Sequence, residues 1–105
     1  MNVLINTGHN IDGRERLIEH FQKVVESALD RFSGQITTLE VHLRDENGDK
    51  GGPADKRCMI EARVENRQPT VVTHYAATLD EAVDGAAEKM GRKLDSTIER
   101  LRERR

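Results

Sequence analysis

The chain has little of what several classes of protein need. Its single cysteine, Cys58, excludes an internal disulfide and favours a reducing compartment. No apolar run approaches the length of a membrane span, and the first residues lack the charged and apolar regions of a signal peptide. The sequence therefore predicts a cytoplasmic protein without a membrane partner.

Aromatic residues and basic charge are also scarce. Tryptophan is absent, and Phe21, Phe32 and Tyr75 do not form the row of aromatic residues on which single strands stack. With 17 basic and 19 acidic residues the formal net charge is −2, whereas nucleic-acid binders usually show a basic excess. We therefore expect no DNA partner, and an RNA-binding function would have to depend on local basic patches.

What the chain does have is charge arranged on amphipathic segments, most clearly in residues 78–105. Thr78, followed three residues later by Glu81, is the signature of a capping box at a helix start. At helical spacing one stripe is apolar, and it consists of Leu79, Val83, Ala86, Ala87, Met90, Leu94, Ile98 and Leu101. One polar flank is basic, and it consists of Lys89, Lys93, Arg100 and Arg104, with Arg92 at its edge. Much of this flank lies mid-helix, where the helix dipole is weak, so the dipole alone does not account for it.

The rest of the chain reads as strands around a second helix. Residues 3–5 predict a short strand, and residues 12–34 a helix with Asp12 as N-cap and Gly34 as C-terminal cap. Residues 36–44 and 57–65 alternate in polarity as half-buried strands do. A last strand covers residues 70–75, but its phase stays open because Val71 and Val72 are both apolar.

The order β-α-β-β-β-α predicts an α+β fold in one domain, residues 1–105. We expect a four-stranded mixed sheet with both helices packed on one face. The opposite face would look at solvent or at a partner, and it would carry Glu40, His42, Arg44, Arg57, Glu61 and Arg63.

No motif predicts catalysis or a bound ion. Residues 45–53 begin like a calcium loop, but Lys50 and Lys56 occupy the positions that need the loop glycine and the bidentate glutamate. The segment is either a hairpin loop or a mobile segment that orders on a partner, with Lys50, Lys56 and Arg57 as phosphate contacts. Neither the histidines nor Cys58 show metal-ligand spacing, and no serine has an obvious base. We predict no cofactor, no metal, no small-molecule substrate and no enzymatic activity.

Residues 82–84 (AVD) and 88–94 (EKMGRKL) resemble the A-I-D…D-K-L-x-R-Q-L segment of the ribosome hibernation-promoting factor and ribosome-associated inhibitor A family, also called sigma-54 modulation proteins. Chain length and element order are similar to the short form. The resemblance implies a stress-response factor that contacts small-subunit rRNA in the decoding channel, obstructs messenger and transfer RNA, and suppresses translation. By matching position it makes Lys89, Arg92 and Lys93 phosphate contacts.

The predicted RNA-binding set is Lys89, Arg92, Lys93, Arg100, Lys56 and Arg57. The expected partner is the small ribosomal subunit with its rRNA. Three features depart from the family pattern. Acids balance bases in the first helix, Asp80 or Glu81 stands where the family often places an aromatic residue, and the 45–55 loop is long and rich in glycine. The alternative is therefore a protein-interaction module that keeps the fold and has lost RNA binding.

Overall fold

The predicted succession of strands and helices is present in the computed structural model, which describes residues 1–8, 13–46 and 55–103. The elements are β1 (Asn2–Thr7), α1 (Arg14–Leu29), the 3-10 turn η1 (Asp30–Phe32), β2 (Ile36–Asp45), β3 (Lys56–Val64), β4 (Thr70–Ala76) and α2 (Leu79–Glu103). The α+β order β-α-β-β-β-α is thus confirmed. The predicted Asp12 cap and most of the 45–53 loop lie outside the described residues.

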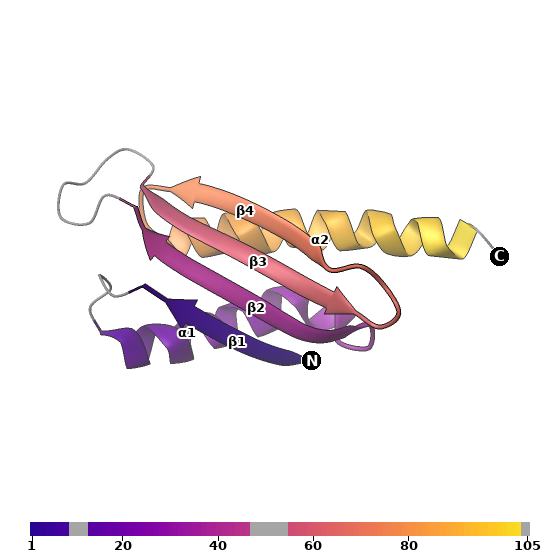
Figure 1. The fold of residues 1–105 in the computed structure, drawn as a ribbon, viewed down its shortest axis with the longest axis horizontal. Helices are drawn as coiled ribbons and strands as arrows, with labels where there is room; N and C mark the ends of the chain where they lie inside the picture. Colours follow the sequence, from indigo (N-terminus) through magenta and orange to yellow (C-terminus); the bar gives the residue numbers. More distant parts are fainter. Residues whose placement is uncertain (9–12, 47–54, 104–105) are drawn as a thin grey trace.

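The four strands form one mixed sheet in the order β1-β2-β3-β4. The β1 strand pairs parallel with β2, because α1 carries the chain back between them, and the short connections that follow make β2, β3 and β4 antiparallel. Both helices cover the same face of the sheet (Figure 1). They run in the same direction, and His20 with Asp80 and Arg31 with Asp95 form ion pairs between them. The predicted packing of both helices on one face is confirmed.

The core lies between the sheet and the apolar stripe of α2. The strand residues that face the helices, such as Leu39, Val41 and Ile60, are completely buried. On α2, Val83, Ala86, Ala87, Met90 and Leu94 are buried against them, while Leu79 and Ile98 pack at the margins. The predicted stripe is therefore confirmed as far as Ile98, since the side chain of Leu101 is not described.

The structure settles the phase of β4. Val72 lies opposite Ile60 and is 9% exposed, whereas Val71 points to the open face and is 41% exposed. By the same alternation His74, opposite Cys58, faces the helices, where its ring lies against Gly85 of α2. A side chain at Gly85 would overlap this ring, so α2 approaches β4 closely only because position 85 is glycine.

Of the three predicted helix ends, the two that lie among the described residues have different outcomes. At the start of α2, the Glu81 amide donates to Thr78 Oγ1 at 3.1 Å and the Thr78 hydroxyl donates to the Glu81 carboxylate at 3.2 Å, which confirms Thr78 as the N-cap. The predicted C-terminal cap at Gly34 is wrong. The α-helix ends at Leu29 and continues as the 3-10 turn η1, and the tighter turn buries Phe32 beside Leu29. Gly34 does not adopt the left-handed conformation of such a cap.

Candidate nucleic-acid interface

Lys89 and Lys93 lie along the exposed edge of β4. Lys89 Nζ donates to the Thr73 carbonyl oxygen at 2.9 Å, and Lys93 Nζ reaches the Val71 carbonyl oxygen at 3.4 Å. As an outer strand, β4 has carbonyls without a neighbouring strand, and the two lysines supply donors to them. A carbonyl carries no net charge, so these contacts fix the ammonium groups in place without neutralising them.

Arg92 and Arg100 lie elsewhere on α2. Arg92 Nη1 donates to Glu88 Oε1 at 2.7 Å, and both side chains are about two-thirds exposed, at 65% and 70%. Arg92 lines a groove of about 400 Å³ between the helices, together with Arg31 and Gly91. Arg100 is exposed, and its Nε lies 3.5 Å from the Ser96 carbonyl oxygen. The structure thus brings Lys89 and Lys93 together at the β4 edge but turns Arg92 toward α1.

Lys56 is held by two aspartates. Its Nζ lies 2.9 Å from an Asp55 carboxylate oxygen and 3.3 Å from one of Asp45, and the side chain is only 21% exposed. The hydrogen bond from Lys56 lowers the pKa of Asp55, and the bond to Asp55 raises the pKa of Lys56. The cluster joins the end of β2 to the start of β3. Lys56 therefore differs from Lys89, because the charge of Lys56 is neutralised by two carboxylates whereas Lys89 contacts a neutral carbonyl.

Arg57 points to the open face of the sheet. Register places it between Arg44 on β2 and Tyr75 on β4, and its guanidinium approaches Met59 Sδ at 3.8 Å. Tyr75 is 51% exposed. The sequence predicted that Arg44 and Arg57 share this face, but it did not predict that they are neighbours or that Tyr75 joins them. Strand alternation gives the face of a residue, whereas adjacency depends on register.

The remaining ionisable side chains were compared, within the described ranges, with the arrangements that catalysis or metal binding uses. Cys58 is completely buried, and burial raises the pKa of its thiol to about 12, so the nucleophilic thiolate does not form near neutral pH. Within residues 1–8, 13–46 and 55–103 no group of three or more His, Cys, Asp or Glu side chains could hold a metal ion.

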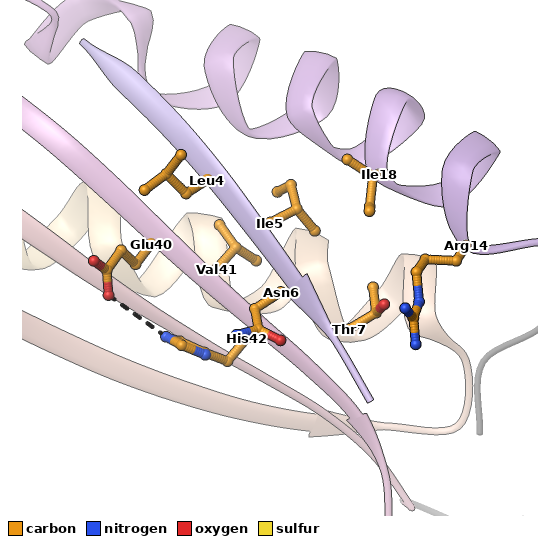
Figure 2. A pocket seen from close by; sticks show the side chains of 9 residues that line it. All are labelled: Leu4, Ile5, Asn6, Thr7, Arg14, Ile18, Glu40, Val41 and His42. Atoms are coloured by element: carbon orange, nitrogen blue, oxygen red, sulfur yellow. Dashed lines mark ion pairs between the residues drawn. The ribbon is translucent and has the colours of Figure 1, made fainter. Parts of the chain in front are cut away.

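A hollow of about 400 Å³ crosses the β1 edge, and Figure 2 shows the nine side chains around it. Glu40 and His42 form an ion pair of 3.7 Å on its open-face side. Thr7 Oγ1 is buried without a hydrogen-bond partner in the described structure, and it lies beside Arg14, away from that pair (Figure 2). Because Thr7 and His42 project from opposite faces of the sheet, they do not converge on one reacting atom.

Comparison with known proteins decides the family. The model described as "Sigma 54 modulation protein / S30EA ribosomal protein" matches residues 4–102. The chain belongs to this family. The sigma 54 modulation / S30EA match begins within β1 and ends in the last turn of α2, so it includes at least part of every strand and of both helices described above. It confirms the resemblance seen in residues 82–94 and associates the chain with ribosome-associated proteins.

Solved structures share the S30EA fold. The N-terminal domain of Protein Y from Thermus thermophilus superposes with a TM-score of 0.71 at 18% identity, covering 92% of this chain and 99% of that one. A ribosomal subunit interface protein from Coxiella burnetii gives 0.69 at 13% identity, covering 92% and 97%. At these identities the likeness establishes the fold. No curated protein sequence matches this family member. Neither helix, within the described ranges, is long and apolar enough to cross a membrane.

Proposed function

We propose that residues 1–105 form a non-catalytic, cytoplasmic, ribosome-associated domain that binds small-subunit rRNA near the decoding channel and suppresses translation under stress. The observation that carries this proposal is the pair of ammonium groups at the β4 edge, Lys89 and Lys93, which have no carboxylate partner among the described residues, in a member of the S30EA family. Membership of the family supports the ribosome as the partner, and the two lysines form a surface that is suited to binding phosphate.

Lys89 and Lys93 are well placed to bind phosphate because their present partners are neutral. Each ammonium group has three N–H donors, and one donor to a β4 carbonyl leaves two for a phosphate oxygen. Holding the side chains at the strand edge also reduces the conformational entropy that binding would remove. The β4 edge is therefore a partly preorganised site for a nucleic-acid backbone.

The other predicted contacts differ in what binding would cost. Arg92 would have to leave Glu88, but an exposed ion pair one helical turn apart is worth only about 0.3–0.5 kcal/mol, so this exchange is easy. Arg100 extends the lysine row along α2, and Arg57 approaches from the neighbouring open face. Lys56 would have to leave two carboxylates, so we assign it to joining the ends of β2 and β3 and expect little direct contact.

Co-sedimentation with purified small ribosomal subunits over a range of salt concentrations tests the proposal. If the β4 edge meets phosphates, binding is strong at low salt and falls steeply as salt rises. The combined variant Lys89→Gln, Arg92→Gln, Lys93→Gln should bind more weakly. Its plot of log affinity against log salt should be flatter by about 0.7–0.9 for each phosphate contact that is lost.

The triple variant needs a stability check and a matched control. Lys89 donates a part-buried hydrogen bond, so its loss costs about 0.5–1.5 kcal/mol of folding free energy, and the melting temperature must show that the variant remains folded. Lys23→Gln is the control, because Lys23 is exposed on α1 and lies 3.7 Å from Glu19. Full binding by the folded triple variant would reject the assignment of these residues. Failure of the unmodified protein to sediment at any salt would reject the ribosomal function.

A protein-interaction module is the second candidate, and the charge balance of α1 favours it. The exposed bases Arg14, Arg16 and Lys23 are interspersed with the exposed acids Glu15 and Glu19. Such a surface gives RNA little net attraction. If this alternative holds, association with a protein partner should change little with salt, and ribonuclease treatment should leave it intact.

A further inference from the structure

Two arginines lie side by side on the open face of the sheet without compensation. Arg44 on β2 and Arg57 on β3 are direct cross-strand partners, a position that brings Cβ atoms within about 4.5–5.5 Å and destabilises like charges. On the same face, Arg63 Nε lies 3.1 Å from Glu61. In the described part of the chain neither Arg44 nor Arg57 has a carboxylate partner. The two positive charges therefore repel each other, and this repulsion does not contribute to the stability of the fold.

The same row ends in an exposed aromatic ring. Tyr75, the cross-strand partner of Arg57, is 51% exposed on the outer strand β4. The acids of this face lie in another row, where Glu40 on β2 pairs in register with Glu61 on β3. The open face is therefore divided along the strands, with two guanidinium groups and one aromatic ring at one end and carboxylates toward the other.

We propose that Arg44, Arg57 and Tyr75 form a binding site for single-stranded RNA. One base stacks on the Tyr75 ring, and the two guanidinium groups bind the adjoining phosphates, for which their planar forks are suited. The uncompensated pair is complementary to an anion, and the exposed ring adds a surface that a base uses and a carboxylate does not. The choice of RNA over DNA rests on the proposed ribosomal function.

The row is also continuous with the β4 edge. Thr73, whose carbonyl oxygen accepts a hydrogen bond from the Lys89 ammonium group, is two residues from Tyr75 on the same strand. A strand that leaves the Tyr75 ring across this edge would therefore meet Lys89 and then Lys93. The open face extends the proposed rRNA surface to an unstacked segment of RNA, rather than forming an isolated second site.

The test uses the full chain and a fluorescein-labelled uridine octamer, with binding followed by fluorescence anisotropy at low salt. Tyr75→Leu, which keeps an apolar side chain but removes the aromatic face, should weaken binding at least about fivefold. Tyr75→Phe should bind normally. Val71→Ala is the matched control, because Val71 is exposed on the same strand and the same face.

The charge is tested with Arg44→Gln combined with Arg57→Gln, which should flatten the salt dependence by about 0.7 per lost contact. Arg63→Gln is the control, since Arg63 shares the face but is paired with Glu61. Melting temperatures confirm that these surface variants are folded. A Tyr75→Leu protein that binds the octamer as the Val71→Ala control does would overturn the proposal, and so would the absence of octamer binding.

Two further arms separate the alternatives. A labelled hexaglutamate peptide that binds through Arg44 and Arg57 while the octamer does not would show a site for acidic protein segments, and the RNA proposal would be wrong. Equal affinity for deoxyuridine and uridine octamers would show that the site recognises single strands without choosing RNA, which overturns the choice of RNA. Ribosome sedimentation that persists without octamer binding would leave the proposed function in place and reject this site alone.

Discussion

The close approach of α2 to β4 makes Gly85→Ala an informative substitution, with Gly91→Ala as its matched control. Both glycines lie inside α2, so alanine should gain about 0.8–1.0 kcal/mol of helix propensity at each position. They differ in what the new methyl group meets. At Gly85 it would overlap the His74 ring, whereas at Gly91 the nearest atom is Arg31 Nη2, at 3.1 Å from the added Cβ.

Because of these contacts, we expect the two substitutions to change the stability of the fold in opposite directions. Overpacking against a half-buried ring costs about 1–3 kcal/mol, so Gly85→Ala should destabilise the protein by about 1 kcal/mol after the propensity gain. The Arg31 guanidinium needs to shift by only a few tenths of an ångström, which weakens without breaking its exposed pair with Asp95, worth about 0.2–1 kcal/mol, and its contact with the Phe32 ring, whose centroid is 4.4 Å away. Gly91→Ala should therefore be neutral or stabilising by up to about 1 kcal/mol.

Urea unfolding measures both variants, and a double-mutant cycle identifies the cause. In a His74→Ala background the steric conflict disappears, so Gly85→Ala should become stabilising by about 1 kcal/mol. A difference of 1 kcal/mol corresponds to about 4–8 °C in melting temperature for a chain of this size. If Gly85→Ala stabilises the unmodified protein as much as Gly91→Ala does, the helix does not depend on glycine for its fit to β4.

Two other perturbations test the core and the strand-end cluster. Leu94→Asp would bury a charge at a position that is 1% exposed and should cost several kcal/mol, enough to abolish cooperative unfolding, whereas Ser96→Asp on the exposed side should stay within about 0.5 kcal/mol. Because Lys56 lowers the pKa of Asp55, that carboxylate stabilises the fold above its ordinary pKa of 3.8, and the stabilisation is lost as the pH falls through the lower folded value. Asp55→Asn should therefore flatten the acid limb of a plot of urea midpoint against pH, and an unchanged limb would show that the pair does not couple to folding.

Periodicity was sufficient for most of the fold because α2, β2 and β3 each have a single apolar face. The stripe of α2 and the alternation of β2 and β3 placed residues such as Met90 and Ile60 correctly. Periodicity left the phase of β4 open, and it did not predict where α1 ends. Val71 and Val72 are equally apolar, and only the structure shows that Val72, opposite Ile60, is the buried one of the two. The end of α1 was missed because a 3-10 turn keeps Phe32 buried.

The candidate site was less accessible from the sequence. A helical wheel gathers Lys89, Arg92 and Lys93 on one side, but the nearby strand edge attracts the lysines and leaves Arg92 with Glu88. In the sequence Lys56 resembles a free cation at the end of a loop, whereas in the structure it lies opposite Asp45 on the neighbouring strand and pairs with it. Charge patterns on one element are visible in a sequence, whereas the partners that neutralise a charge come from elements that only folding brings together.

The lysines at the β4 edge also explain how a chain of net charge −2 can present a cationic surface. An outer strand needs protection against pairing with other strands, and Lys89 and Lys93 provide it by donating to main-chain carbonyls. The acids of the first turns, such as Asp80 and Asp84, are not at pairing distance from these lysines along the helix, so the local positive charge remains although the net charge of the chain is negative. Phosphate binding need not end the protection, because a lysine with three donors can retain its carbonyl while it contacts an oxygen of the backbone. Acids elsewhere on the surface weaken the long-range attraction of RNA at low salt, where screening is weak. At 0.1 M salt, charges more than about 10 Å away are largely screened, so distant acids have less effect on the contact between a lysine and a phosphate.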